Sequence, residues 1–199
     1  MSKRKTGNKR QLLSNYLIVV EGETEQLYLE SLKSLMDYER KKQINIKIVK
    51  ANAGNAKTFV QDAIKLKKKL ELPNVYVVFD NDNYKYIADA FALAEKNDIR
   101  IIYSNICFEL WFLLHFKFTT SQFEKCNKLI LQLKRHFPGY KKASYKTYEK
   151  FNGIMTDAME NAKKLEDFHQ KHSQRIPLWE LNPYTNMHHL IKEVFALDS

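Results

Sequence analysis

The feature that most constrains this chain is a regular alternation of short β-branched runs with longer amphipathic segments up to residue 103. Four runs have the length and residue types of strands: 15–20 (NYLIVV), 44–49 (INIKIV), 75–79 (VYVVF) and 100–103 (RIIY). Three stretches place apolar residues at helical spacing: 23–38, 57–70 and 84–97. Because strands joined through helices run parallel with right-handed crossovers, the pattern predicts an α/β fold with a parallel sheet.

The runs NYLIVV and VYVVF are apolar on both sides of the strand, which is typical of strands covered by helices on each face. From Thr119 onward the strand pattern stops, and three segments are spaced like helices: about 120–136, 147–171 and 184–197. We therefore expect a helical lobe that packs on the core as one compact unit. The predicted division is a basic flexible arm at 1–13, an α/β core at 14–116 and a basic helical lobe at 117–199.

Composition excludes several classes of protein. With 199 residues, 44% apolar and 13% aromatic residues and only 5 Gly and 4 Pro, most of the chain should fold around a core. No apolar run approaches the ~20 residues needed to span a bilayer. The basic start MSKRKTGNKR has no apolar h-region behind it before a strand-like run begins, so we do not expect a signal peptide. Cys107 and Cys126 are too few for a disulfide framework, and we expect both to be packing residues. These features predict a cytoplasmic protein.

The formal net charge of +10 is unevenly distributed. Residues 1–20 carry five basic and no acidic residues, and residues 21–116 carry 14 of each. Residues 117–150 carry nine basic and two acidic residues, whereas 151–199 are slightly acidic. This division suits a protein that grips a polyanion with one part and handles it chemically with another. The alternative is that lysine-rich helix faces only keep the protein soluble.

Acidic residues follow three of the predicted strands. Glu21-Gly22 follows the first, Asp80-Asn81-Asp82 the third, and Glu109 comes soon after the fourth. In an open α/β sheet ligands bind outside the carboxyl ends of the strands. Asp80 and Asp82 can point to the same side, and Glu21 on a neighbouring strand would complete an oxygen site suited to Mg²⁺ or Mn²⁺.

The same residues also have a purely structural interpretation. Asp80 and Asp82 would then form an Asx turn and a helix cap. Glu25 would complement the dipole of the helix that it begins. Glu109 would start a helix and orient Ser104-Asn105. Both interpretations remain open for these carboxylates.

Beyond these single residues, two levels of resemblance are visible. Glu21-Gly22 after one strand and Asp80-x-Asp82 after another resemble the Toprim domain of topoisomerases, primases and old-type nucleases. More narrowly, four blocks between residues 18 and 190 resemble the RloB-like family: VVEGETEQLYL, VFDNDN, SNICFELWFLLHF and NPYTNMHHL. The family has Pro where this chain has Ile106, a departure that touches no proposed ligand. The resemblance implies a Toprim-like parallel sheet flanked by helices, followed by a C-terminal helical lobe.

The resemblance also implies a function: a metal-dependent nuclease that hydrolyses phosphodiester bonds of DNA or RNA, including tRNA. Such a protein would act as an effector in a phage-defence or restriction-linked system, beside an ATPase partner. By the same resemblance, Glu21 is a metal ligand or general base, and Asp80 and Asp82 hold Mg²⁺. Glu25, one helical turn beyond Glu21, and Glu109 would serve a second metal.

The basic segment interleaves positive charge with tyrosine, which suits a phosphate backbone and unstacked bases. The candidate nucleic-acid-binding residues are Lys134, Arg135, Lys141, Lys142, Tyr145 and Lys146. Lys146 is placed like a family lysine, and the resemblance gives it a catalytic role in stabilising charge in the transition state. The alternative for the whole set is a solvated helix face and loop.

Other polar and aromatic residues have mainly structural expectations. Residues 111–114 are apolar nearly all round and should lie in the core, with base stacking by Trp111 as the alternative. His115 should cap the end of its helix, although it could contact a phosphate or a metal. Residues 182–185 read as a turn and cap that open a last helix at 186–197. His188 and His189 are adjacent and should point to different helix faces, which makes a poor metal pair.

Two other functions compete with the nuclease. One is a non-catalytic subunit whose basic lobe docks on nucleic acid or on an ATPase partner. Another is a phosphate-signalling α/β domain, but Glu21-Gly22 stands where that class has an acidic pair. The sequence contains no G-x-x-x-x-G-K-[ST] loop, so we do not expect the chain itself to be a P-loop ATPase.

Overall fold

Five strands form one sheet in the computed structural model, which describes residues 13–81, 86–144 and 149–195. Its order is β2-β1-β3-β4-β5, and every neighbouring pair is parallel except β4 with β5. The strands are β1 (Ser14–Val20), β2 (Ile44–Lys50), β3 (Asn74–Asp80), β4 (Arg100–Asn105) and β5 (Tyr184–Thr185). The predicted parallel α/β fold is therefore confirmed.

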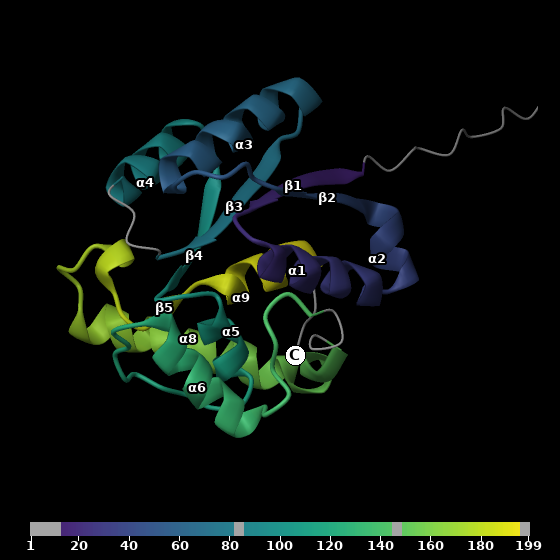
Figure 1. The fold of residues 1–199 in the computed structure, drawn as a ribbon. Coiled ribbons are helices and arrows are strands. Elements are labelled where there is room, and N and C mark those ends of the chain that lie inside the picture. Colours follow the sequence, from purple (N-terminus) through teal and green to yellow (C-terminus); the bar gives the residue numbers. More distant parts are fainter. Residues whose placement is uncertain (1–12, 82–85, 145–148, 196–199) are drawn as a thin grey trace, which may run out of the picture.

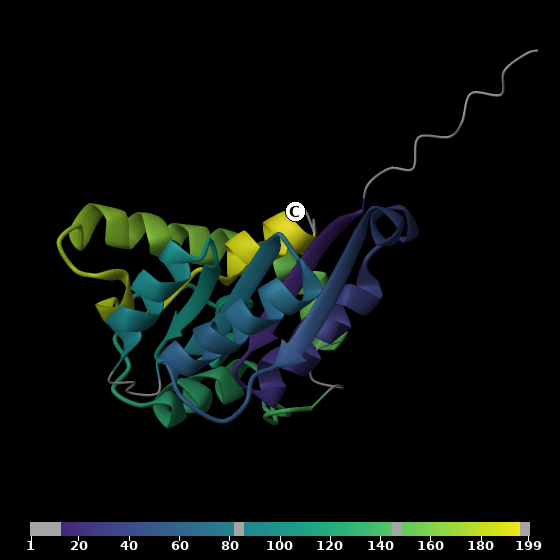
Figure 2. The same cartoon turned by 90° about the horizontal axis from the view of Figure 1, so that it is seen from above.

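Helices cover both faces of this sheet (Figures 1 and 2). One layer is made of α3 (Ala56–Leu70) and α4 (Ile87–Lys96), which pack on each other and on the strands. The other elements are α1 (Glu23–Leu35), α2 (Tyr38–Gln43), α5 (Glu109–Leu114), α6 (Cys126–His136), η1 (Glu149–Ile154), α8 (Met155–His172), η2 (Leu178–Glu180), α9 (Met187–Leu190) and η3 (Ile191–Phe195). None of the helices in the described ranges is long and apolar enough to cross a membrane.

The central strands are buried on both sides, as their apolar runs predicted. In β1, Leu17 and Val19 belong to the core beneath α3 and α4, whereas Ile18 and Val20 belong to the core on the opposite face. All four side chains are fully inaccessible to solvent. This alternation follows from the two-residue period of a strand, which sends successive side chains to opposite faces.

The predicted helix at 23–38 ends three residues early in the structure, and a second helix, which was not predicted, follows it. The first, α1, ends at Leu35, and Asp37 then accepts a hydrogen bond from the backbone N–H of Arg40 at 2.8 Å. An aspartate in this position caps a new helix, because it satisfies a backbone donor that has no partner within the helix. The chain therefore turns at residues 36–37 before α2 leads into β2.

The prediction that no strand follows Thr119 is wrong. Tyr184 and Thr185 pair antiparallel with Asn105 and Ser104 and add β5 to the sheet. The side chain of Asn186 continues this pairing, since it accepts from the backbone N–H of Tyr103 at 2.7 Å. A strand of two residues has no detectable period, so its local sequence resembles a turn before a helix. The last helical segment is correspondingly shorter than predicted and begins at Met187.

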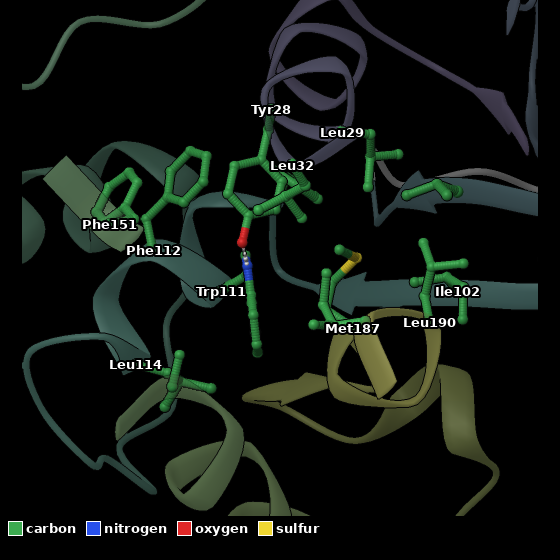
Figure 3. Packing of buried hydrophobic residues seen from close by; sticks show 14 of the residues in the cluster. Tyr28, Leu29, Leu32, Ile102, Trp111, Phe112, Leu114, Phe151, Met187 and Leu190 are labelled. Atoms are coloured by element: carbon green, nitrogen blue, oxygen red, sulfur yellow. Dashed lines mark hydrogen bonds between the residues drawn. The ribbon is translucent and has the colours of Figure 1, made fainter. Parts of the chain in front are cut away.

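The second core joins the sheet to the helical lobe (Figure 3). Residues 111–114 of α5 are fully buried, which confirms their predicted place in the core. Trp111 Nε1 donates to the Tyr28 hydroxyl at 2.6 Å, and Phe112 stacks on Phe151 with ring centroids 4.7 Å apart. Base stacking by Trp111 is excluded by this burial. The arm at 1–13 lies almost wholly outside the described residues, and the division at residue 117 stays a prediction.

The buried bond between Trp111 and Tyr28 gives a first test. Tyr28→Phe removes the acceptor and leaves the indole N–H buried without a partner, which should lower the free energy of unfolding by about 1–3 kcal/mol. Urea denaturation measures this difference. Tyr38→Phe is the matched control, since the Tyr38 side chain is exposed, and it should change stability by less than ~0.5 kcal/mol. A Tyr28→Phe protein as stable as the wild type would contradict the packing described above.

Candidate metal centre at the edge of the sheet

Two predicted site residues meet at the carboxyl ends of β1 and β3. Glu21 directly follows β1, and Asp80 is the last residue of β3. The backbone N–H of Asp80 donates to Glu21 Oε2 at 3.1 Å, and the backbone N–H of Glu21 donates to the carbonyl of Val78 at 3.0 Å. The parallel pairing of the two strands thus holds the Glu21 carboxylate against the end of β3.

The neighbouring loop after β4 fixes the other side of Asp80. The backbone N–H of Phe108 donates to Asp80 Oδ2 at 3.1 Å. Asn81 Nδ2 donates to Asn105 Oδ1 at 3.2 Å, and so ties the segment after β3 to the end of β4. The bond from Phe108 sets the direction of one oxygen of the Asp80 carboxylate. Asp82, which the sequence places in the same site, lies outside the described residues.

Glu25 lies one turn into α1 and folds back toward the start of the helix. A Cβ atom on Gly22 would lie only 2.7 Å from Glu25 Oε2. The backbone of Gly22 has φ −122°, an extended conformation that any residue adopts. A side chain at position 22 would therefore displace the end of the Glu25 side chain from its present place.

The environment of Glu25 opposes its negative charge. Its side chain is buried, and this burial, together with repulsion from Glu21 and Glu109, raises its pKa from 4.5 to about 7. Lys142 acts in the opposite direction. A carboxyl group in this state gains from any cation that reaches it, because a nearby positive charge favours the ionised form.

Glu109 begins α5 and is almost completely buried. Its Oε1 accepts from the Tyr140 hydroxyl at 2.8 Å and lies 3.2 Å from Lys142 Nζ. Burial alone would lower the pKa of Lys142, but Glu109, Asp80 and Glu25 outweigh it and raise that pKa. Lys142 therefore brings a fixed positive charge to the carboxylates. Sequence reasoning missed Tyr140 as part of the site, because a tyrosine in a basic loop gives no signal that its hydroxyl reaches a buried glutamate.

The other predicted basic residues that the structure describes are exposed, as Lys142 is. Lys134 and Arg135 are exposed at the end of α6, and Lys141 is exposed in the loop that follows. This loop is anchored to α1, since the backbone N–H of Ala143 donates to Thr24 Oγ1 at 3.3 Å. Tyr145 and Lys146 lie outside the described residues, so their predicted roles stay predictions.

The prediction that Cys107 and Cys126 are only packing residues is wrong, because they form a disulfide. The bond joins the loop after β4 to the first residue of α6, across 19 positions of sequence. The Cys126 sulfur lies 3.5 Å from Glu109 Oε2, beside the carboxylates. The pairing depends on how α5 folds between the two cysteines, and their spacing alone does not reveal that geometry.

His115 is the last-turn residue that the sequence predicted as a helix cap, and it caps α5. Its Nδ1 lies 2.9 Å from the Trp111 carbonyl, and burial lowers its pKa to about 4. A neutral, enclosed imidazole in this position does not contact a phosphate. The predicted structural role is thus the one that the structure supports.

The prediction that the side chains of His188 and His189 point apart is wrong. Their Nε2 atoms lie 3.3 Å and 2.9 Å from the two carboxylate oxygens of Glu166. Adjacent residues of a regular helix point about 100° apart, but long imidazole side chains reach a shared partner on a helix packed against them. Asn182 anchors the loop before α6, because its side-chain amide bonds both backbone groups of Phe123.

The carboxylates at the sheet edge are chemically of the type that binds a hard divalent cation. Glu21, Asp80, Glu25 and Glu109 offer oxygen ligands only, the donor set that Mg²⁺ and Mn²⁺ prefer. The raised pKa of Glu25 agrees with such a group, because a cation beside this carboxyl would favour its ionised form. With Asp82, these residues are the ones that would hold the metal.

The fold and the site together define an α/β protein with a carboxylate cluster at the carboxyl edge of a mostly parallel sheet. A family model described as RloB-like protein matches residues 16–194. The chain therefore belongs to the RloB-like protein family. A search of curated proteins gave no match. The five-stranded sheet is consistent with the Toprim-like arrangement that the sequence resembles.

The raised pKa of Glu25 predicts a pH effect on stability in metal-free protein. Between pH 4.5 and about 7 the folded state keeps a proton that the unfolded chain loses, so the free energy of unfolding falls as the pH rises. In the wild type, the free energy of unfolding should fall by about 3 kcal/mol between these two pH values because of Glu25. Glu25→Gln should abolish this fall. Urea denaturation in EDTA at low and neutral pH measures it. Glu39→Gln, at an exposed residue of α2, is the control; equal pH slopes in wild type and Glu25→Gln would contradict the prediction.

The disulfide gives a separate prediction. The intact mass of the oxidised protein should be lower than that of the reduced protein by the mass of two hydrogen atoms. When the oxidised protein is unfolded, thiol reagents should not modify it. Reduction should cost about 3 kcal/mol of stability, as expected for a closed loop of this length. The double variant Cys107→Ser, Cys126→Ser should be insensitive to reductant. Two reactive thiols in protein equilibrated with excess oxidised glutathione would contradict the pairing.

Proposed function

We propose that this protein is a Mg²⁺- or Mn²⁺-dependent nuclease that hydrolyses phosphodiester bonds of DNA or RNA, including tRNA. We further propose that it is an effector of a phage-defence or restriction-linked system and acts beside an ATPase partner. The observation that carries the proposal is the pair formed by Glu21 and Asp80 at the ends of adjacent parallel strands. Membership of the RloB-like family supports it.

The chain's own groups would act as follows. The backbone N–H groups of Asp80 and Phe108 orient the carboxylates of Glu21 and Asp80, so that both can bind one cation with Asp82. When bound, Mg²⁺ supplies activation of the attacking water and neutralisation of phosphate charge. Glu25 and Glu109 would bind a second ion, and Glu21 would otherwise accept the proton of the water as general base.

Lys142 adds a positive charge that the carboxylates alone do not provide. Its Nζ contacts Glu109, and its side chain remains 58% exposed. A lysine in this position would contact the phosphate whose charge develops during cleavage. The exposed Lys134, Arg135 and Lys141 extend the positive surface outward, where they would bind the nucleic-acid backbone.

One observation favours the alternative, a non-catalytic subunit that binds nucleic acid or an ATPase partner. Lys142 already pairs with Glu109, so part of the negative charge is balanced by the protein itself. Buried carboxylates that are neutralised in this way can have a structural role. In that case the basic loop binds a partner and the carboxylates hold the loop in place.

The experiment that tests the proposal compares cleavage of single-stranded DNA, duplex DNA and tRNA with and without Mg²⁺ or Mn²⁺. Glu21→Gln and Asp80→Asn should each lower the cleavage rate by about 100-fold or more, while nucleic-acid binding at fixed salt persists. Glu39→Gln is the control, because its carboxylate is exposed on α2. Equal activity in wild type and both site variants would overturn the site; binding without any divalent-dependent cleavage would support the non-catalytic subunit.

A further inference from the structure

A second group of metal-binding side chains lies in the helical lobe, apart from the sheet edge. Glu166 of α8 and His188 and His189 of α9 bring one ligand atom each within 4.8 Å of one another. His189 Nε2 lies 2.9 Å from Glu166 Oε1, and His188 Nε2 lies 3.3 Å from Glu166 Oε2. The two imidazole rings lie side by side, with centroids 4.0 Å apart. The three groups therefore already converge as ligands of one ion would.

The state of His188 suits a metal ligand. Its side chain is buried, and the ring faces Glu166 through Nε2. The bond from Nε2 to Glu166 is long at 3.3 Å, so no strong partner holds the ring proton on Nε2.

The surroundings give an ion access and compatible charge. The His189 side chain is 53% exposed and that of Glu166 is 18% exposed, so solvent reaches the group and water can complete the coordination. Lys163 lies 3.9 Å from Glu166 Oε2 but pairs more closely with Asp167, at 2.7 Å. The nearest lysine is thus engaged by another carboxylate and does not fill the position between Glu166 and the histidines.

The ligand types distinguish this group from the sheet edge. Two imidazole nitrogens and one carboxylate oxygen are the ligand set of Zn²⁺ sites that keep a fourth position for water, whereas Mg²⁺ prefers oxygen ligands alone. After β5 the chain runs away from the carboxyl ends of the parallel strands. Asn186 Nδ2 donates to the carbonyl of Ile101, which lies in the amino-terminal half of β4. The two groups are thus separate in position and in chemistry.

We propose that Glu166, His188 and His189 form a Zn²⁺ site that joins α8 to α9. The ion would replace two weak hydrogen bonds by three coordinate bonds between the long helix of the lobe and the segment that follows the last strand of the sheet. Zinc would thereby stabilise the docking of the C-terminal segment. This inference does not depend on the nuclease proposal, because none of its ligands belongs to the sheet-edge group.

The test uses the full-length chain with its disulfide intact, stripped of metal with EDTA and titrated with ZnCl₂ by calorimetry. One Zn²⁺ should bind per chain with a dissociation constant of about micromolar or tighter, and the midpoint of thermal unfolding should rise. His189→Ala and Glu166→Gln should each weaken binding at least about tenfold. His172→Ala is the matched control, since His172 is exposed on α8 and its Nδ1 lies 2.8 Å from its own helix carbonyl at Phe168.

Cobalt substitution provides a readout that a mere loss of folding would not imitate. Co²⁺ in this site should give visible absorption bands without thiolate charge-transfer bands, and the Cys107→Ser, Cys126→Ser variant should keep them. Glu21→Gln should bind Zn²⁺ like the wild type, so failure of the nuclease proposal and of this one are distinguishable. A dissociation constant for Zn²⁺ weaker than about 100 μM would overturn the site. Zn²⁺ binding that is unchanged in both His189→Ala and Glu166→Gln would overturn it as well. Either result would leave only hydrogen bonds between the two histidines and the carboxylate.

Discussion

Repulsion among carboxylates at the edge of the sheet is the constraint on which the rest of the site depends. Parallel pairing brings the carboxyl ends of β1 and β3 together, and Glu21 and Asp80 with them. Glu25 and Glu109 then add negative charge in a poorly solvated place, as the raised pKa of Glu25 shows. Contacts among the described residues offset this repulsion, from the backbone donor on Asp80 to the ammonium group of Lys142. The electrostatic cost of the group is lowered by a proton on Glu25 or by a cation, either the protein's own or a bound one.

Helix α5 connects this edge to the core of the molecule. Its first residue, Glu109, faces the carboxylates, and its following residues 111–114 are completely buried. The bond between Trp111 and Tyr28 fixes α5 against α1, the helix that carries Glu25. The disulfide fixes the two segments that flank α5 to each other. The distance between Glu25 and Glu109 is therefore set by packing in the core, and the site does not rest on mobile side chains alone.

The sequence predicts those parts of the structure that depend on local patterns. Runs such as VYVVF define buried strands by themselves, and the residue after each strand must lie at the same edge in a parallel sheet. Features that depend on contacts between distant residues escaped prediction. Tyr184 becomes a strand only because Asn105 lies beside it, and the Cys107–Cys126 bond requires the fold of α5. Likewise, the sequence alone does not show that His188 and His189 share a partner, because that partner, Glu166, lies more than 20 positions earlier in the chain.

The distribution of charge along the chain acquires a physical meaning from this arrangement. The neutral α/β half gathers carboxylates, and the basic segment returns to them through Lys142 while its other described lysines face solvent. In the last, slightly acidic segment, one carboxylate, that of Glu166, lies beside the imidazoles of His188 and His189. An oxygen-only group selects hard ions such as Mg²⁺, and a nitrogen-rich group selects Zn²⁺ at far lower concentration. The two proposed sites can therefore be filled independently in one small fold, one to bring a phosphate to reaction and the other to hold the C-terminal segment in place.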